Sequence, residues 1–409
     1  MKRFNSTHAM KLAVLGMAIG SSLSAYADEG KSLDAVQVTG NRSELAIKKS
    51  LAAVTVITRA EIEQSQAPDV ADLLSQQTGF DITRSGGAGS LVSIFTRGSN
   101  SNHTLILIDG VRVNTAMQGS FDISNLPIAL IERIEIVRGP RAALWGSDAI
   151  GGVIQIFTRK AKQFVELRAG SYGRAEVDAG FSVGDEENNF GAVLGYGRLS
   201  GFSATNSAAW GFDLDNDGYR NRHLLLRGQA ALGNQRLSAF ALAIKADVEF
   251  DQGETDQDVR QIGLNLSGDI SDRWQHSLSL SRSYEKLDTP DYDNIFGSRR
   301  LSLDWVNTID LNEQNRLNLG VNWSRENGYN EDFGSTTIDQ TRRNTGLFAS
   351  WYGDFSVNRF ELAVRHDDNS QFGNKTTAQA AWGIQFNDDL RLRASWGQGF
   401  RAPNFNELY

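Results

Sequence analysis

The 409-residue sequence contains no cysteine, only 5 prolines and only 5 histidines. Without cysteine the chain has no disulfides, no thiolate metal site and no cysteine nucleophile. The histidines after the N-terminal region, His103, His223, His276 and His366, are dispersed and form no pair with metal-ligand spacing. No nucleophile, base and orienting group occur together, so the sequence does not predict an enzyme.

Excess positive charge and long apolar runs are also missing. The formal net charge is -8 at pH 7, which argues against a general nucleic-acid-binding protein, because such proteins need a basic surface. Beyond the N-terminal region no apolar run approaches the roughly 20 residues that a membrane-spanning helix needs. A membrane-embedded body would therefore have to be a β-barrel.

The N-terminal region has the three parts of a secretory signal. Lys2, Arg3 and Lys11 precede the apolar run Leu12–Gly20, and Ala25-Tyr26-Ala27 is a small-residue cleavage site. We expect residues 1–27 to be a signal peptide that is cleaved after Ala27. The apolar run is too short for a transmembrane helix.

Glycine is abundant, with 40 residues, and is dense in the segment Ile131–Arg159. Two patterns typical of strands, Ile131–Val137 and Val153–Thr158, flank this segment's glycine-containing turns. Glycine at Gly146 and Gly151-Gly152 permits the backbone to reverse or to approach another chain closely. The segment closes a region, residues 54–160, that mixes strand and helix patterns.

Residues 54–160 are predicted to form a compact α+β domain. Thr58 and Glu61 have the spacing of a capping box at the start of one helix, and a second helix is expected to begin near Pro68. The loop Gly86–Gly89 lacks the lysine and hydroxyl residue of a phosphate-binding loop, so we interpret it as a ligand-facing surface.

From residue 161 onward the chain alternates apolar and polar residues over long segments, as in Leu301, Leu303 and Trp305 with Ser302 and Asp304 between them. Roughly thirteen such strands fit before Tyr409. Short polar turns alternate strictly with longer connections. This asymmetry predicts an antiparallel transmembrane β-barrel with brief turns on one side and long external loops on the other.

Two further segments suggest binding. The extended run Asp34–Gly40 has the character of a strand that adds to the sheet edge of another protein, although an ordinary first strand is the alternative. The carboxylates of Asp213, Asp215 and Asp217 alternate before Gly218, as in a calcium loop, and Asp251 lies in the next external loop. A solvated acidic loop is the alternative to calcium.

Several of these segments together resemble the TonB-dependent outer-membrane receptors. They are DAVQVTGNR from Asp34, LILIDGVRVN from Leu105, PIALIERIEIVRGPRAALWGSDAIGGV from Pro127, DNDG from Asp215 and RHDDNSQFG from Arg365. The resemblance covers about Asp34 to Tyr409 and is greatest to the cobalamin (vitamin B12) branch of the family. It implies an α+β plug domain (54–160) followed by an antiparallel transmembrane β-barrel (161–409), after a periplasmic segment (28–53).

The resemblance also implies roles for individual residues. The TonB box, which couples the family to TonB and its inner-membrane energy source, falls on Asp34, Ala35, Val36, Gln37, Val38, Thr39 and Gly40. The ligand-facing plug loops fall on Ser90, Leu91, Val92, Met117, Gln118 and Gly119. The calcium ligands match Asp215 and Asp217, with Asp251 a weaker match, while the preceding part of that loop, Gly201–Ser203, departs from the family pattern.

We therefore predict TonB-dependent active transport of cobalamin across the outer membrane of a Gram-negative bacterium. A receptor for a ferric siderophore or another metal chelate is the alternative, because a fold does not fix a ligand. A passive porin or an adhesin is a third hypothesis. The family's barrels have about 22 strands, so we expect this chain to be a fragment that neither inserts stably nor transports by itself.

Overall fold

The computed structural model describes residues 37–38, 42, 45–46, 49–160, 162–208, 212–387 and 390–409. The predicted signal peptide, residues 1–27, lies outside the described residues, as do Asp34, Ala35, Val36, Thr39 and Gly40 of the predicted TonB box. Gln37 and Val38 form the two-residue strand β1 (Gln37–Val38), which pairs antiparallel with β2 (Leu45–Ala46). Part of the predicted TonB box is thus extended and already has a strand partner within the chain.

The first domain contains a mixed five-stranded sheet and a two-stranded sheet, and we call it the plug. The larger sheet has the order β3 (Ala53–Thr58), β8 (Ile131–Arg138), β9 (Gly152–Thr158), β6 (Thr104–Ile108) and β7 (Val111–Arg112). The smaller sheet pairs β4 (Phe80–Arg84) with β5 (Val92–Thr96). The helices are α2 (Arg59–Ser65), α3 (Val70–Ser75), α4 (Ala142–Trp145) and the 3₁₀ turns η3 (Ser101–His103) and η4 (Ile128–Leu130). The predicted α+β plug is therefore confirmed.

Local capping determines where the first two helices of the plug begin. Thr58 accepts a hydrogen bond from the backbone of Glu61, whose carboxylate accepts one in return, so the predicted capping box at α2 is present. Helix α3 begins at Val70 and not at Pro68. Asp69 is the N-cap because its carboxylate accepts a hydrogen bond from the backbone N–H of Asp72, and this leaves Pro68 before the helix.

Strand β8 is more buried than its alternating sequence predicted. Ile134 and Ile136 lie in the plug core, as expected, but Glu135 on the opposite face is also fully buried. This carboxylate lies 3.0 Å from the guanidinium of Arg133. Strand β8 lies between β3 and β9 and is buried on both faces, so alternation here does not indicate a solvent-facing side.

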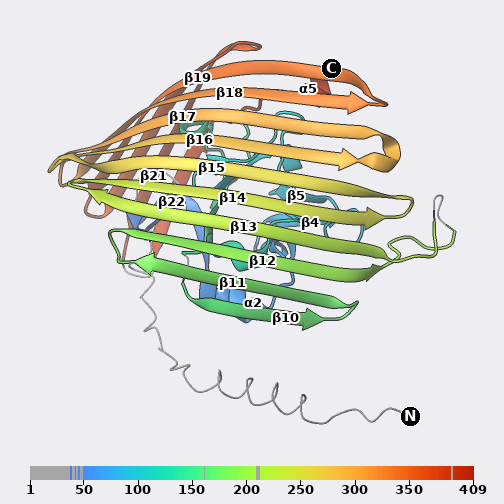
Figure 1. Cartoon of the computed structure of the whole chain (residues 1–409). Coiled ribbons are helices and arrows are strands. Elements are labelled where there is room, and N and C mark those ends of the chain that lie inside the picture. The colour runs from blue at the N-terminus through green and yellow to red at the C-terminus, as the bar shows by residue number, and fades with distance from the viewer. Residues whose placement is uncertain are drawn as a thin grey trace, which may run out of the picture. The chain divides into compact units, whose positions relative to one another are not determined.

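The second domain is one antiparallel sheet of 13 strands in sequence order, which we call the wall. Its strands are β10 (Phe164–Gly170), β11 (Arg174–Gly184), β12 (Asn189–Phe202), β13 (Asp217–Leu232), β14 (Gln235–Phe250), β15 (Gly253–Ser271), β16 (Trp274–Thr289), β17 (Asn294–Asn312), β18 (Asn315–Asp332), β19 (Ser335–Phe355), β20 (Asn358–Asn369), β21 (Gly373–Gln385) and β22 (Arg391–Gly397). The 3₁₀ turn η5 (Pro290–Tyr292) joins β16 to β17, and the helix α5 (Phe405–Leu408) follows β22. The wall curves around the plug, with β21 and β22 behind it in the view of Figure 1. The prediction of about thirteen strands is confirmed.

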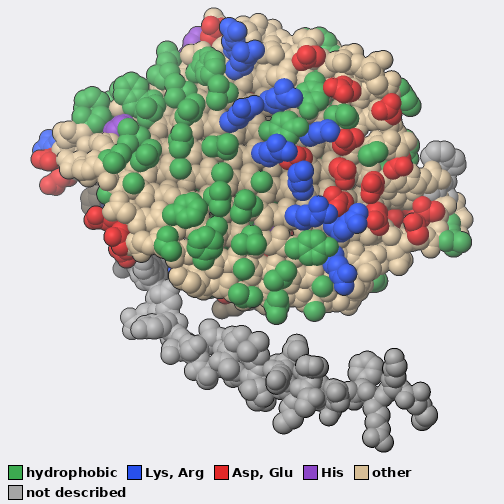
Figure 2. Space-filling view, viewed as in Figure 1, with side chains coloured by type: hydrophobic (Ala, Val, Ile, Leu, Met, Phe, Trp, Pro, Cys, Tyr) green, Lys and Arg blue, Asp and Glu red, His purple; other side chains and the backbone are tan. Residues whose placement is uncertain are grey.

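Side chains alternate across the wall as the sequence predicted. Leu301, Leu303 and Trp305 point outward and are 40% to 43% exposed. Asp304, between two of them, points inward and forms an ion pair with Arg42. Many apolar side chains therefore face outward over the wall strands, as Figure 2 shows.

The predicted long external loops are mostly wrong. Among the described wall strands, only β12 and β13 have a long connection, whereas β14 and β15 are joined by Asp251 and Gln252 alone, and β18 and β19 by Phe333 and Gly334. The polar segments that separated the apolar patterns continue the ladder, for example where Asp247 pairs with Asp256. The strands thus extend past the apolar band instead of ending at it. No helix in the described part of the chain is long and apolar enough to cross a membrane.

Candidate functional site

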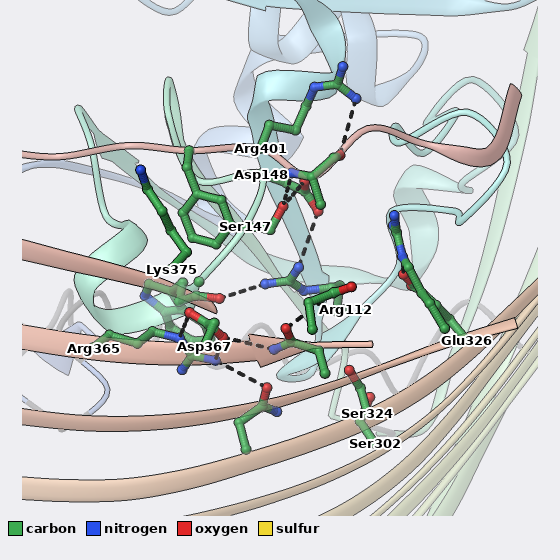
Figure 3. Close-up of a pocket in the computed structure, with 18 of the residues that line it drawn as sticks. Arg112, Ser147, Asp148, Ser302, Ser324, Glu326, Arg365, Asp367, Lys375 and Arg401 are labelled. Carbon is green, nitrogen blue, oxygen red and sulfur yellow. Dashed lines mark hydrogen bonds and ion pairs between the residues drawn. The ribbon is translucent and has the colours of Figure 1, made fainter. Parts of the chain in front are cut away.

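A cavity of about 240 Å³ lies between the plug and the wall (Figure 3). On the plug side it is lined by Arg112 at the end of β7, by Trp145 at the end of α4 and by Gly146, Ser147 and Asp148 after this helix. The wall contributes inward-facing side chains of β16 to β20, the β20–β21 turn and the start of β21, and Phe400–Pro403 also lines the cavity. Chain segments that are far apart in sequence therefore build this site.

The cavity has more cationic than acidic side chains. The cationic residues in its lining are Arg42, Arg112, Arg300, Arg342, Arg365, Lys375 and Arg401, and the acidic ones are Asp148, Asp304, Glu326 and Asp367. Most of these arginines are largely buried, and buried charges interact more strongly than charges at an open surface. The lining therefore favours an anionic ligand over a neutral or cationic ligand.

Arg112 is fixed at the plug side of the cavity. Its guanidinium donates to the backbone oxygen of Trp145 at 2.6 Å and lies 3.2 Å from a carboxylate oxygen of Asp148. Burial lowers the pKa of Arg112 to about 10, although the charge of Asp148 opposes this shift. Arg112 remains a cation at neutral pH, because a pKa of about 10 is well above 7.

Arg365 leaves an unused donor at the wall side of the cavity. Two of its nitrogens bind both carboxylate oxygens of Asp367 at 2.7 Å each, while Nη1 has no hydrogen-bond partner. Arg365 is only 1% exposed. Gly146, at φ +77°, permits this close packing, because a Cβ there would meet the guanidinium at 3.1 Å. A buried donor without a partner is costly, so an acceptor from a bound guest would be stabilising.

Arg42 lines the same cavity and lies two residues after the predicted TonB box. Its guanidinium forms an ion pair with Asp304 at 2.7 Å and lies 4.0 Å from the ring centroid of Trp145. Its Nε donates to the backbone oxygen of Leu144. The segment that follows the predicted box is therefore anchored in the cavity by one side chain that contacts both plug and wall.

Other ion pairs also connect the plug to the wall. Arg141 and Glu361 are both almost fully buried and lie 3.1 Å apart. Arg227 of the wall lies 3.1 Å from Asp109 of the plug and also donates to the backbone oxygen of Thr158. Removing one partner of the buried Arg141–Glu361 pair would leave an uncompensated charge, so this pair in particular holds the plug in its position.

The first predicted ligand loop, Ser90–Val92, is held by a buried carboxylate. Leu91 is 47% exposed, whereas Val92 is 4% exposed. The carboxylate of Asp122 accepts hydrogen bonds from the backbone N–H groups of Val92 and Ser124. Burial raises the pKa of Asp122 to about 6, against the effect of these hydrogen bonds. Within this loop, Leu91 is the residue most accessible to a ligand.

The second predicted ligand loop is covered. Met117 is 2% exposed and packs with Phe405 of α5, and the side-chain amide of Asn404 donates to the backbone oxygen of Gln118. Gly119, at φ +75°, lies close to side chains of the same C-terminal segment. Ligand contact by Met117, Gln118 and Gly119 stays a prediction, and it would require α5 to move.

The predicted acidic residues gather at one end of the wall. Asp213 accepts a hydrogen bond from the backbone of Gln252, which joins the β12–β13 loop to the β14–β15 turn beside Asp251. A shared hydrogen bond with Asp215 lowers the pKa of Asp213 and raises the pKa of Asp215. One buried oxygen of Asp213 has no hydrogen-bond partner.

The fit of this acidic loop to calcium is incomplete. The carboxylate of Asp217 accepts a hydrogen bond from the backbone of Ala204, and Asp251 contacts Ser203, so both acids already have protein partners. No group of three or more acidic or histidine side chains in the described ranges is placed to hold a metal ion. The oxygen donors have the right chemistry for calcium, but they do not converge in this structure.

Sequence reasoning missed most of the cavity residues. Arg300 and Arg342 were not predicted as site residues, while Arg112, Arg365 and Asp367 were noticed only as parts of family motifs. A signal was present, because a charged residue at an inward-facing position of an alternating strand must find a partner inside. Which inward charges meet depends on the register of strands and on the plug, and the sequence alone does not give these.

Two family models match this chain. The TonB-dependent receptor plug domain matches residues 46–153, and the TonB-dependent receptor-like β-barrel matches residues 171–409. The chain therefore belongs to the TonB-dependent receptor family, whose β-barrels lie in the outer membrane.

Solved structures agree with this fold. A ferric enterobactin receptor mutant from Pseudomonas aeruginosa is 16% identical, with a TM-score of 0.71 over 86% of this chain and 62% of its own. The siderophore receptor PirA from the same organism is 21% identical, with a TM-score of 0.64 over 86% and 65%. A complex of FpvAI with pyocin S2 gives 15% identity and a TM-score of 0.74 over 89% and 58%. The chain thus spans less than two thirds of the length of these proteins.

Proposed function

We propose that this chain binds an anionic metal chelate of the ferric siderophore class for TonB-coupled uptake. The observation that carries this proposal is the cationic cavity, with the buried, unpartnered Nη1 of Arg365. The similar structures include a ferric enterobactin receptor and a siderophore receptor, which supports the same ligand class. The ligand named first by the sequence, cobalamin, gains no such support and becomes the second candidate.

Binding would proceed by charge pairing and not by bond chemistry. Arg365 and Lys375 line the cavity beside the β20–β21 turn, and an anionic chelate would accept hydrogen bonds from both. Arg112 would contribute positive charge from the plug side. Asp148 forms an ion pair with Arg112, and Asp367 forms one with Arg365. These carboxylates keep the two arginines oriented before a chelate binds.

Direct titration tests the ligand class. The detergent-solubilised chain would be titrated with ferric enterobactin and with cyanocobalamin, and the quenching of tryptophan fluorescence would be followed, since Trp145 lines the cavity. We expect micromolar binding of the ferric chelate, weakened about tenfold or more by Lys375→Gln with Arg365→Gln. Arg236→Gln, an exposed cation at a short turn, is the matched control and should leave affinity unchanged.

The outcomes separate the candidates. Binding of cyanocobalamin without binding of the ferric chelate would replace the proposal by the cobalamin candidate, which the DNDG motif at Asp215–Gly218 suggested. Binding of neither ligand would contradict both.

Energy coupling is a second part of the proposal. The extended segment at β1 would be displaced from β2 and would pair with TonB, which would pull on the chain through Arg42. Deleting residues 34–40 from the ligand-loaded protein should abolish capture of the periplasmic domain of TonB. Undiminished capture would favour a passive porin or an adhesin.

A further inference from the structure

A buried chain of polar contacts joins the wall to residues 86–92 of the plug, which we call the ligand loop. The chain begins at Asp178 of β11 and His223 of β13, which lie in one row across β11 to β13. Between them in this row is Gly195 of β12, where a Cβ would collide with both side chains. Glycine at this position therefore gives the pair the space to meet.

Two oxygen atoms fix the ring of His223. Its Nε2 lies 2.8 Å from the carboxylate of Asp178, and its Nδ1 lies 3.1 Å from the side-chain oxygen of Asn221. The three residues are only 3% to 8% exposed. A buried polar group that loses its partner is costly, so these contacts hold the amide of Asn221 in one orientation.

Asn221 connects His223 to the plug through its side-chain nitrogen. This nitrogen donates to the backbone oxygen of Asn125 at 3.0 Å and to the hydroxyl of Tyr219 at 3.0 Å. With the amide reversed, its oxygen would face the carbonyl oxygen of Asn125, and two acceptors cannot form a hydrogen bond. The orientation that His223 favours is therefore the one that binds the plug.

The contacts of this chain converge on Gly89 in the ligand loop. The side-chain amide of Asn125 donates to the backbone oxygen of Gly89 at 3.3 Å, and the hydroxyl of Ser124 donates to the same oxygen at 3.0 Å. Tyr219 packs against the backbone of Gly89, since a Cβ there would lie 2.5 Å from its ring. The wall and the plug thus hold the same point of the loop.

We propose that His223 and Asn221 are positioning residues that pre-organise the ligand loop for binding. Both are buried and act through Gly89, two residues before the accessible Leu91. A loop that is already fixed loses less conformational freedom when a ligand binds, and this raises the affinity. In its effect on affinity the inference rests on the proposed function, whereas the order of the loop can be measured without a ligand.

Asn221→Asp tests this role with almost no change of shape. Aspartate can still accept from Nδ1 of His223, but it has no N–H group to donate to Asn125 and Tyr219. Asn221→Ser removes the amide without adding a charge and should have the same effect. A nitroxide label at Leu91→Cys, the only cysteine, should give a broad spectrum in the parent chain and a narrower spectrum in both variants.

In the unlabelled chain, both variants should also weaken the binding of ferric enterobactin about tenfold. Asn318→Asp is the matched control. Asn318 is an asparagine of the wall that is 2% exposed, and it donates to the hydroxyl of Ser350, which is also in the wall, at 3.2 Å. This control loses the same kind of donor but no contact with the plug, so it should leave the label and the affinity unchanged.

A second label at Asp81→Cys, an exposed position of β4, separates a loosened loop from a loosened plug and should keep its spectrum. The proposal is overturned if the label at Leu91→Cys stays broad in both Asn221 variants, or if Asn318→Asp or the label at Asp81→Cys shows the same narrowing. A narrowed spectrum without loss of affinity would also overturn it. If the parent chain does not bind ferric enterobactin, the proposed function fails, while the spectra still decide on the positioning role.

Discussion

Arg42 contacts the plug and the wall through a single guanidinium. Replacement by alanine would remove the ion pair to Asp304 and the contact with the ring of Trp145, with a loss of about 2–3 kcal/mol of local stabilisation. We expect Arg42→Ala to detach the β1–β2 segment. A nitroxide label at Ala46 should then give the narrow spectrum of a mobile group.

Lys49→Ala is a suitable control for Arg42→Ala. Lys49 is a nearby cation with an ion pair to Asp354 at 3.1 Å, but its side chain is 53% exposed, and such surface pairs contribute little. An unchanged spectrum in Arg42→Ala, or an equal change in Lys49→Ala, would contradict the anchoring role.

Asp122 should make the stability of the plug depend on pH. Because burial raises its pKa from 3.8 to about 6, the folded state binds a proton more tightly than the unfolded state. The resulting stabilisation is complete below about pH 4 and is lost as the pH rises through 6, and its size is about 3 kcal/mol. Asp122→Asn should therefore raise the melting temperature at pH 7.5 and change it little at pH 4.

Thermal unfolding of both proteins between pH 4 and pH 8 checks this sign. The asparagine carbonyl can still accept from the N–H groups of Val92 and Ser124, so the local hydrogen bonds remain. Lower stability of Asp122→Asn at pH 7.5 would show that the carboxylate is needed in its ionised form.

Helix α5 covers the loop around Met117 mainly through Phe405. Phe405 is 1% exposed and packs on Ala116 and Met117, so Phe405→Ala should cost about 3–5 kcal/mol. A cysteine introduced as Met117→Cys should react with maleimide slowly in the parent chain and rapidly when Phe405→Ala is added. Leu408→Ala, on the same helix but 40% exposed, should leave the reaction slow.

Slow labelling of Met117→Cys in the Phe405→Ala background would show that another part of the chain covers this position. Gly328 is relevant to that outcome, because a Cβ at this position would meet Phe405 at 2.6 Å and Met117 at 2.8 Å. The wall backbone at Gly328 therefore approaches both side chains closely.

The acidic loop on β12–β13 predicts a response to calcium. If Ca²⁺ draws Asp213, Asp215 and Asp217 together, millimolar Ca²⁺ should raise the melting temperature of the chain, and Asp213→Asn with Asp215→Asn should abolish the increase. Mg²⁺ serves as the control ion, because it demands a tighter octahedral geometry. An equal response to both ions, or none to Ca²⁺, would leave an acidic loop that is merely solvated.

Strand faces and helix caps could be predicted from the sequence, whereas strand ends could not. Leu301, Leu303 and Trp305 share a face because side chains alternate in any strand, and Thr58 with Glu61 caps a helix through local contacts alone. The polar runs between the apolar patterns were expected to be loops. They continue as strands because neighbouring strands satisfy their backbone, a non-local effect.

The candidate site was harder to predict from the sequence than the fold. The cavity combines Arg42, Arg112 and Arg365, which are separated by most of the chain and meet only when the plug lies within the wall. The burial of Met117 likewise depends on Phe405, nearly 300 residues later. Family motifs identified some of these positions but did not indicate their contacts.

At the scale of the whole molecule, the wall is an open sheet within the described residues. Strand β10 pairs only with β11, and β22 pairs only with β21. Edge backbone groups in hydrocarbon are costly, so we expect the 409-residue chain alone to be digested by external protease when mixed with phospholipid vesicles. Full protease protection, with the slow unfolding of a closed barrel, would contradict this expectation.

The ion pair between Arg42 and Asp304 links two binding events by thermodynamic reciprocity. A guest that competes for Asp304 or displaces Arg42 lowers the cost of extracting the segment at β1. By linkage, extraction of that segment must then raise the affinity of the cavity for the same guest by the same factor. Any further release of the guest towards the cell must come from work done on the plug, since the equilibrium coupling alone would hold the guest more tightly.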